Sequence, residues 1–402
     1  MAKTLIRFLL LILFLGVGLN LCPPHHNVMS AEPEKYIRVA ILKDVSSFKL
    51  TMQGKFQFIR NGELDVRPRP IKESNVVATS DGFWLGGERF VVDRLKIIPK
   101  RDATIYVNGR RFRGEVEILR KGQKGLTVVN TVELEDYIKG VLYHEVSHRW
   151  TMEAFKAQAV CTRTYALYRM KEGKTLDYDL TDDIYSQVYG GKNSERYRTN
   201  IAVNRTRGQV LAYNKRILPT YFHATCGGHT EDVSELWKEN LPPLKGIACK
   251  FCQQSPHYRW KKNFRLKDIQ DKLNAKGYNL GLIKEISISE RNDSGRIRKL
   301  QITTRDGAAV EISGKDFRNI VGPNFLKSNN YEVVMKGYFM DVLGRGWGHG
   351  VGMCQWGANF MSRARHQYDE ILKYYYPGAD LVDYHAITLE PDRKNKNAVA
   401  GF

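Results

Sequence analysis

Three short segments of the 402-residue chain combine residue types that could do chemistry, and the first is His144–His148, which reads HEVSH. On one helix the spacing HExxH places two imidazoles on the same face, where they can bind zinc, and makes the glutamate a general base. Thr151 follows three residues later and is typical of the N-cap of a new helix. We therefore expect His148 to lie at or beyond a helix end, so that a zinc peptidase is only a distant alternative.

The second segment pairs a CxxH motif, Cys226 to His229, with a CxxC motif, Cys249 to Cys252. Four nitrogen and sulfur ligands at this spacing predict a tetrahedral structural zinc site. His223 and His257 are further candidate ligands. The alternative is a disulfide between Cys249 and Cys252, with Cys226 as a free thiol.

The third segment, residues 344–358, reads GRGWGHGVGMCQWGA. Glycines at this density permit positive φ angles and a close approach of the backbone to a ligand. His349 and Gln355 could hydrogen-bond a sugar, and Trp347 or Trp356 could stack on one. The alternative is a tight structural turn. The segment lacks the lysine and the spacing of a phosphate-binding loop.

These segments depend on elements that the hydrophobic pattern outlines. Short alternating stretches with Asn-Gly turns predict a β-rich part from residue 36 to about 132. Two helices are expected at 134–148 and 152–171. On the second helix Lys156 and Arg163 are seven residues apart and share one face. A pair of cations on one helix face is often only a solvated surface.

The remaining chain predicts a mixed α+β fold. Residues 180–260 contain loops and scattered strands. A helix at 266–276 and alternating strands predict a small α+β module inserted at 263–340, and a closing helix is expected at 368–376. The predicted parts are 1–31 (export segment), 32–132 (β-rich), 133–262 (first part of the core), 263–340 (inserted module), 341–390 (Gly-rich loop and closing helix) and 391–402 (tail).

The N-terminus predicts export. Lys3 and Arg7 precede an apolar run, residues 8–21, that is typical of a signal-peptide core and short for a membrane span. An uncleaved anchor is the alternative, and a lipid on Cys22 is not favoured because Leu21 precedes it. The membrane is thus expected to be a partner only through this segment.

The charge indicates the kind of partner. The net charge of +20 and the pI of about 9.6 favour polyanions such as nucleic acid, anionic lipid or an acidic wall polymer. An exported protein does not meet nucleic acid, so nucleic acid is not expected as a partner.

Several blocks of the chain resemble the SpoIID/LytB family, in the family's order and over about residues 36–390. The blocks are LEDYIKGV (134–141), Glu145, EAFKAQAVCTRTY (153–165), SQVYG (186–190), YFHATCGG (221–228), GRGWGHGVGMCQWGA (344–358) and YYYPG (374–378). Two departures are Cys226, where the family usually has serine, and the histidines that flank Glu145.

This resemblance implies a lytic transglycosylase that cuts the glycan strands of peptidoglycan, with Glu145 as the essential acid. It implies that Lys156, Arg163, Gln187, Tyr189, His223, His349 and Gln355 lie near the cleft that binds substrate. It also implies an alternative, an amidase enhancer that binds glycan or a wall amidase without cutting. No cofactor is required for the transglycosylase chemistry itself, and the zinc expected at the cysteines would be structural.

One carboxyl group suffices for this reaction. It protonates the glycosidic oxygen and then takes the proton of the muramoyl 6-hydroxyl as that oxygen closes on C1, so the carboxylate pair of ordinary glycoside hydrolysis is not needed. Such an acid needs a pKa raised by burial. Lys156 or Arg163 beside Glu145 would oppose that shift.

Overall fold

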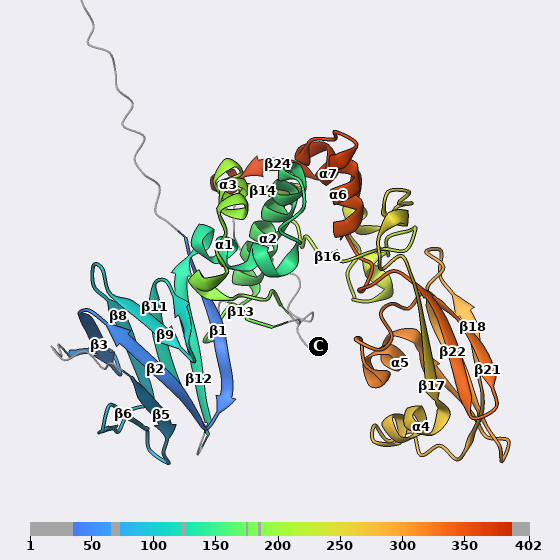
Figure 1. The fold of residues 1–402 in the computed structure, drawn as a ribbon, viewed down its shortest axis with the longest axis horizontal. Coiled ribbons are helices and arrows are strands. Elements are labelled where there is room, and N and C mark those ends of the chain that lie inside the picture. Colours follow the sequence, from blue (N-terminus) through green and yellow to red (C-terminus); the bar gives the residue numbers. More distant parts are fainter. Residues whose placement is uncertain (1–34, 66–72, 123–124, 174–175, 184–185, 388–402) are drawn as a thin grey trace, which may run out of the picture. The chain divides into compact units, whose positions relative to one another are not determined.

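The computed structural model describes residues 35–65, 73–122, 125–173, 176–183 and 186–387 (Figure 1). The expected export segment with Cys22, and the expected tail at 391–402, lie outside the described residues. The described chain mixes strands and helices, with a β-rich N-terminal part, and this confirms the predicted α+β class. Among the described residues, no helix combines the length and apolar character that crossing a membrane requires.

The β-rich part consists of two sheets. The first has the order β13-β1-β12-β11-β8-β3-β4 and the second the order β10-β9-β2-β5-β6-β7. Alternate residues of β1, such as Ile37, Val39 and Ile41, are buried in one core with residues of both sheets, as a half-buried strand requires. The strands are β1 (Tyr36–Val45), β2 (Ser47–Gln53), β3 (Phe56–Arg60), β4 (Glu63–Asp65), β5 (Ser74–Ala78), β6 (Phe83–Leu85), β7 (Glu88–Phe90), β8 (Arg94–Pro99), β9 (Thr104–Val107), β10 (Arg110–Phe112), β11 (Glu115–Lys121), β12 (Gly125–Glu133) and β13 (Leu180–Thr181).

The helical core begins directly after β12. Helix α1 spans Leu134–Glu145 and packs on the core of the two sheets, and α2 spans Met152–Glu172. The hydroxyl of Thr151 accepts a hydrogen bond from the N–H of Ala154, which confirms the predicted N-cap. Helix α3 (Tyr197–Arg205) contacts α1 and α2. The sheet β15-β14-β24 comprises Arg216–Ile217, Gln209–Tyr213 and Asp380–Asp383.

Two distant parts of the core meet in a short parallel pair. Strand β16 (Phe222–His223) pairs with β23 (Met353–Cys354), which aligns His223 with Cys354. Helix α6 (Gln355–Arg363) follows β23 directly, and α7 (Tyr368–Tyr375) is the expected closing helix. Helix α6 was not predicted, because its sequence begins inside the Gly-rich segment.

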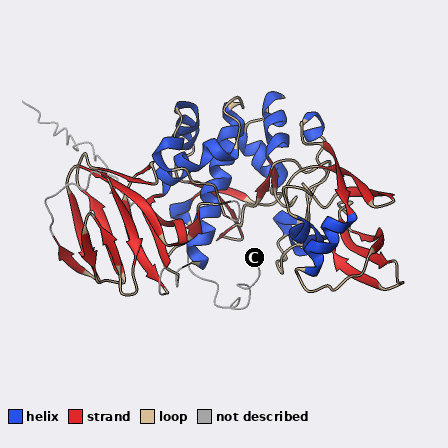
Figure 2. Ribbon diagram, turned by 60° about the horizontal axis from the view of Figure 1, so that its bottom comes forward, coloured by secondary structure: helices blue, strands red, loops and turns tan. Residues whose placement is uncertain are grey.

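The inserted module has a hydrophobic core of its own. It is built of helices and strands (Figure 2). Its sheets have the orders β17-β22-β21 and β18-β19-β20. Strands β17 and β22 pair antiparallel from Arg259 opposite Arg345 to Arg265 opposite Phe339, so the module is opened and closed by neighbouring strands. The elements are β17 (Arg259–Arg265), α4 (Leu266–Asn274), β18 (Ile283–Arg291), β19 (Ile297–Thr304), β20 (Ala309–Ser313), α5 (Gly314–Val321), β21 (Tyr331–Lys336) and β22 (Phe339–Arg345).

Candidate functional site

Glu145 is the last residue of α1. The apolar face of this helix, with Tyr137, Val141 and Leu142, is fully buried and fixes the helix on the core. Val146 then turns to an extended conformation, φ −137° and ψ 147°, which ends the helix. Glu145 is half-buried at this helix end, whereas its neighbour His144 is exposed.

The carboxyl group of Glu145 holds its proton near neutral pH. Burial raises its pKa from an ordinary 4.5 to about 7. The backbone N–H of Val188 and the side chain of Gln355 hydrogen-bond the carboxylate and limit this rise. No cation among the described residues contributes to the shift, so the opposition expected from Lys156 or Arg163 does not arise.

Gln355 connects Glu145 to α2 and α6. It is the first residue of α6, and its Nε2 donates to Oε1 of Gln158 in α2 at 3.3 Å. The sulfur of Cys354 caps the same helix by accepting from the N–H of Gly357 at 3.3 Å. The structure thus brings the predicted residue Gln355 to Glu145.

Aromatic rings lie beside these two residues. Trp356 follows Gln355, and its ring centroid is 5.3 Å from that of Trp150, on the loop after α1. His257 and Trp347 pair edge to face at 4.5 Å, and the Nζ of Lys327 is 4.8 Å from the Trp347 ring centroid. Trp150 is buried, whereas Trp356, His257 and Trp347 are partly exposed, and exposed faces of this kind can stack on sugar rings.

A second aromatic group lies on the α2 side. Burial is the main cause that raises the pKa of Tyr165 on this helix. Tyr165 contacts Tyr221 at 5.9 Å between centroids, Tyr221 stacks on Trp237 at 4.5 Å, and His349 lies 5.5 Å from Trp237. Sequence reasoning missed Trp150 and Trp237, because no motif surrounds either tryptophan and only folding brings them to the site.

The two predicted histidines are neutral. Burial lowers the pKa of His349 to about 4 and lowers that of His223 as well. The Nδ1 of His349 accepts from the N–H of Val351 at 3.1 Å, so its Nε2 is the donor to the carbonyl of Phe222 at 2.9 Å. Both nitrogens of His349 are therefore used within the protein, which corrects the expectation that it hydrogen-bonds a sugar.

His223 differs from His349 in one respect. Its Nδ1 lies 3.1 Å from the carbonyl oxygen of Val351, to which it donates, whereas its Nε2 is buried and has no hydrogen-bond partner among the described residues. His223 is fully enclosed and cannot reach a glycan strand without a rearrangement.

Gln187 and Tyr189 are also enclosed. The hydroxyl of Tyr137 donates to Gln187 at 2.9 Å, and the hydroxyl of Tyr189 donates to Asn130 at 3.0 Å. Val188 lies between them in sequence, and its backbone N–H donates a hydrogen bond to the carboxylate of Glu145. Their polar groups bond within the protein behind α1, which corrects the binding role implied for them.

Arg163 is corrected in the same way. Its side chain is 0% exposed, and its guanidinium makes two hydrogen bonds of 2.7 Å to the carboxylate of Glu135, which is 2% exposed. It also donates to the carbonyls of Gln209 and Val203. The prediction of a binding cation and the alternative of a solvated face are both wrong, because α2 is buried on nearly all sides here.

Lys156 is partly exposed and paired. Its Nζ lies 2.7 Å from Oε1 of Glu153 and 5.1 Å from the ring centroid of Tyr368. The structure therefore places it in a local ion pair at the start of α2 and shows no contact with Glu145.

The HEVSH segment lacks the geometry that zinc needs. Helix α1 ends at Glu145, so His144 and His148 do not share a helix face. His144 instead pairs with Ser194 at 2.6 Å between Nε2 and Oγ. Within the part of the chain that the structure describes, neither histidine belongs to a group that could hold a metal ion.

Four cysteines form a compact buried cluster. The sulfurs of Cys226, Cys249, Cys252 and Cys354 all lie within 4.8 Å of one another, and none is in a disulfide. A tetrahedral zinc site of four thiolates has Zn–S bonds of about 2.3 Å, which this separation accommodates. The N–H of Cys226 also donates to Cys354 Sγ at 3.3 Å, and the hydroxyl of Tyr375 lies 3.2 Å from Cys249 Sγ.

The fourth sulfur replaces the predicted histidine. Cys354 reaches the cluster because β16 and β23 pair, whereas His229 turns its Nδ1 to the carbonyl of Thr230 at 2.6 Å. The predicted ligands Cys226, Cys249 and Cys252 are brought together, and His229 is not among them. Gly357 leaves room for this packing, since a Cβ there would lie 2.0 Å from the Tyr375 hydroxyl.

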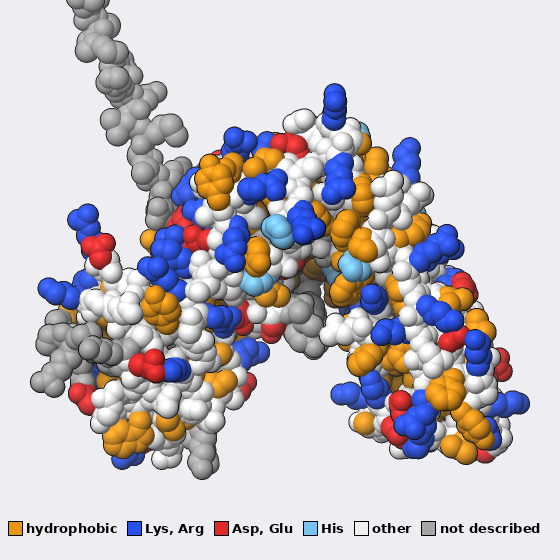
Figure 3. Space-filling view, viewed as in Figure 1, with side chains coloured by type: hydrophobic (Ala, Val, Ile, Leu, Met, Phe, Trp, Pro, Cys, Tyr) orange, Lys and Arg blue, Asp and Glu red, His pale blue; other side chains and the backbone are white. Residues whose placement is uncertain are grey.

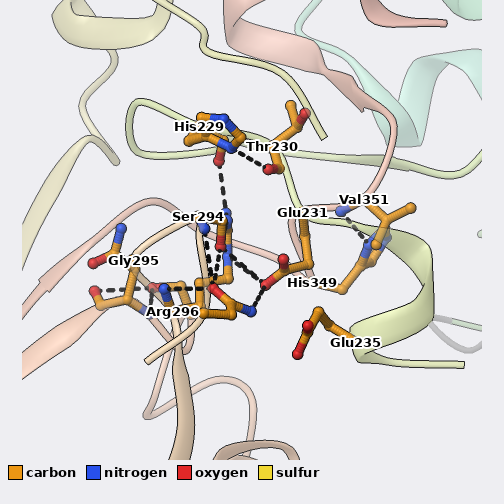
Figure 4. Close-up of polar contacts among 12 residues, drawn as sticks. His229, Thr230, Glu231, Glu235, Ser294, Gly295, Arg296, His349 and Val351 are labelled. Atoms are coloured by element: carbon orange, nitrogen blue, oxygen red, sulfur yellow. Dashed lines mark hydrogen bonds and ion pairs between the residues drawn. The ribbon is translucent and has the colours of Figure 1, made fainter. Parts of the chain in front are cut away.

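A buried arginine joins the inserted module to the same loop (Figure 4). Arg296, in the turn before β19, donates to the carbonyls of Cys226 at 2.8 Å and His229 at 3.0 Å. The buried carboxylate of Glu231 lies 3.9 Å from Arg296 Nε and accepts from Ser294 at 3.1 Å. These hydrogen bonds and the ion pair therefore join the module to the core, although Nε of Arg296 has no hydrogen-bond partner among the described residues.

Comparison with known proteins agrees with this arrangement. Residues 122–213 match the family described as "Stage II sporulation protein", and residues 244–352 match a domain of unknown function (DUF8618). An uncharacterized protein of Brachyspira hyodysenteriae is 36% identical over 80% of each chain. The amidase enhancer of Bacillus subtilis is 28% identical over 61% of this chain and 40% of its own length.

The stage II sporulation protein D of Bacillus subtilis is 31% identical over 63% of this chain and 75% of its own length. These relatives indicate a function related to sporulation or the cell wall. The order of the matching blocks, the α+β fold and these identities together show that the chain belongs to the SpoIID/LytB family.

Proposed function

We propose that this protein is an exported lytic transglycosylase that cuts the glycan strands of peptidoglycan, with Glu145 as its single general acid and base. The observation that carries the proposal is the half-buried carboxyl group at the end of α1, whose pKa burial raises to about 7. A group with this pKa can donate a proton near neutral pH and accept one in the next step.

Each atom has a place in the reaction. The Glu145 carboxyl gives its proton to the glycosidic oxygen as the bond from that oxygen to the muramoyl C1 breaks. The muramoyl 6-hydroxyl oxygen then bonds to C1, and its proton returns to Glu145. The products are a free hydroxyl on the leaving sugar and a 1,6-anhydro-muramoyl end, and no water is consumed.

The surrounding residues suit such a substrate. The partly exposed rings of Trp356, Tyr221 and Trp237 offer faces for sugars. Gln355 hydrogen-bonds the carboxylate once the proton has left, and so supports the second protonation state. The net charge of +20 attracts an anionic wall polymer.

We also propose that the four-cysteine cluster holds a structural zinc ion. Cys226, Cys249, Cys252 and Cys354 would hold the ion, which would tie the Cys226 loop to the start of α6. The ion takes no part in the glycan reaction, because Glu145 supplies both proton transfers.

The test uses wild-type protein and Glu145→Gln on intact sacculi and on glycan stripped of peptides by an amidase, with His148→Ala as control. We expect 1,6-anhydro ends with wild type and the control and none with Glu145→Gln. Absence of these ends with wild-type protein on both substrates would refute the enzyme.

The amidase enhancer remains the second candidate, because one relative carries that name. It predicts glycan binding without new ends, and faster release of peptides when a wall amidase is added.

A further inference from the structure

A basic pocket separate from Glu145 lies where the inserted module meets the loop after β16. Its volume is about 940 Å³. Four cations line it, and a single acidic residue, Glu332, accompanies them; the cations are Arg259, Lys261, Arg291 and Arg345. The balance of charge in the pocket is therefore strongly positive.

Two of these cations form no ion pair within the part of the chain that the structure describes. Lys261 pairs with Asp341 at 3.2 Å, and Arg291 pairs with Glu332 at 2.7 Å. Arg259 and Arg345 are exposed, and neither has an ion pair with an acidic side chain among the described residues. The acidic groups within reach are thus already used by the other two cations.

The two unpaired arginines stand directly opposite each other. Arg259 of β17 is in register with Arg345 of β22, so the two side chains leave the same face of the sheet. Like charges at such a position destabilise a sheet. An anion between the two guanidinium groups would remove this repulsion.

The wall of the pocket lets a ligand approach. Gly227, Gly228 and Gly295 line it with φ angles of +79°, +119° and +77°, a conformation that side chains disfavour. The backbone there is uncovered by any Cβ. Figure 3 shows that Lys and Arg side chains are frequent on the visible surface of the molecule, which would guide an anion toward such a pocket.

We propose that this pocket binds an oxyanion of the wall polymer, held by the guanidinium groups of Arg259 and Arg345. Guanidinium groups bind carboxylates and phosphates through paired, charge-assisted hydrogen bonds. The oxyanion is either a carboxylate on the glycan or a phosphate on an anionic wall polymer. That the oxyanion belongs to a wall polymer rests on the proposed function. Binding of an oxyanion in this pocket does not itself require that the protein cleaves glycan.

The test measures binding by titration calorimetry at low salt, in the Glu145→Gln background so that no ligand is cut. The ligands are peptide-stripped glycan, the same glycan with its carboxylates amidated, and polyphosphate. The test variant is Arg259→Gln with Arg345→Gln. The matched control is Lys276→Gln with Lys284→Gln, which removes two exposed cations of the same module that do not line the pocket.

We expect the double variant Arg259→Gln with Arg345→Gln to bind one anionic ligand about tenfold more weakly than the parent protein. We expect the lysine pair to change this binding by less than about twofold. If the arginine substitutions weaken binding of unmodified glycan but not of amidated glycan, the bound group is the carboxylate. If they weaken binding of polyphosphate alone, the bound group is a phosphate. Arg259→Lys with Arg345→Lys keeps the charge, loses the forked geometry and should lie between the two.

The proposal would be overturned if the double arginine variant weakened the binding of no ligand more than the double lysine variant does. Equal melting temperatures confirm that the variants are folded. If wild-type protein produces no 1,6-anhydro ends but the arginine pair still loses binding, the proposed reaction fails and the pocket stands.

Discussion

At the scale of single residues, the protein keeps the Glu145 carboxyl group partly away from water and so keeps its proton. Burial raises the pKa to about 7, whereas an unfolded chain leaves it near 4.5. Between these values the folded protein binds a proton that the unfolded chain has released. The resulting contribution to stability is full below pH 4.5 and is lost as the pH rises through 7.

Replacing Glu145 with glutamine removes this dependence. Relative to Glu145→Gln, wild-type protein should lose about 2 kcal/mol of unfolding free energy between pH 4 and pH 8, a value that allows for the partial exposure of the side chain. Urea unfolding at several pH values measures the difference. Parallel curves for Glu145→Gln and wild type would contradict the raised pKa.

Arg163 provides a second test at this scale. Arg163→Met leaves the Glu135 carboxylate buried without its partner, so we expect a loss of about 3–5 kcal/mol in unfolding free energy. Arg163→Met combined with Glu135→Leu should recover most of that loss. The partly exposed pair of Lys156 and Glu153 is the control. Lys156→Met should lower the free energy of unfolding by less than about 1 kcal/mol. An Arg163→Met protein of unchanged stability but weaker glycan binding would instead restore the role that the sequence implied.

The sequence predicted Glu145 and Gln355 for one site, and the structure brings them into contact, but the sequence could not identify the role of Arg163. Both roles considered for Arg163 assumed that one face of α2 meets solvent. That face is covered by α1, α3 and β14, which contact α2 from other parts of the chain. Only the folded structure shows that Glu135 lies within reach of it.

At the scale of elements, the pairing of β16 with β23 decides which side chains form the cysteine cluster. The motif spacing found three of its four members, because these are close in sequence. Cys354 is separated from them by the inserted module, and it joins them only through this parallel pair. The sequence spacing favoured His229 as the fourth ligand because His229, unlike Cys354, is close to Cys226 in the sequence.

The cluster makes a distinct prediction about metal. Wild-type protein and His229→Ala should each carry about one zinc ion per chain, because Zn²⁺ takes four thiolates in a closed site, and Cys354→Ala should carry far less. Elemental analysis of purified protein measures this. Zinc that is lost from His229→Ala but kept in Cys354→Ala would contradict the cluster.

If the cluster holds zinc as proposed, removal of the ion should also affect the proposed catalytic site. Cys354 caps α6, and Gln355 follows it, so a strong chelator should lower both the melting temperature and the glycan activity of wild-type protein. Activity that is fully retained while the zinc is lost would show that α6 is held without the ion.

At the scale of the whole molecule, the order of the parts was predictable and their joints were not. The β-rich part, the helical core and the inserted module follow from periodicity. The joint between module and core depends on Arg296, which sequence reasoning did not single out. Nothing in the local sequence of Arg296 distinguishes it from the many other surface cations of this basic chain.

Arg296→Met should loosen that joint. It leaves Glu231 and the carbonyls of Cys226 and His229 buried without this donor, so we expect a loss of about 3 kcal/mol in stability. We also expect faster amide hydrogen exchange in the Cys226–Glu231 loop. The exposed Lys284→Met should have neither effect. Unchanged exchange in Arg296→Met would mean that other contacts hold the module.

The backbone hydrogen bond from Gly346 to Tyr258, at 3.0 Å, closes the base of the inserted module. The chain leaves the core and returns to it at nearly the same point in space. A module of this kind can be gained or removed as one unit, since joining the two flanking residues restores a continuous core chain. A core shortened in this way would keep Glu145 and all four cysteines and would lose Arg259 and Arg345, so the reaction and the choice of polymer would reside in separable parts of one gene.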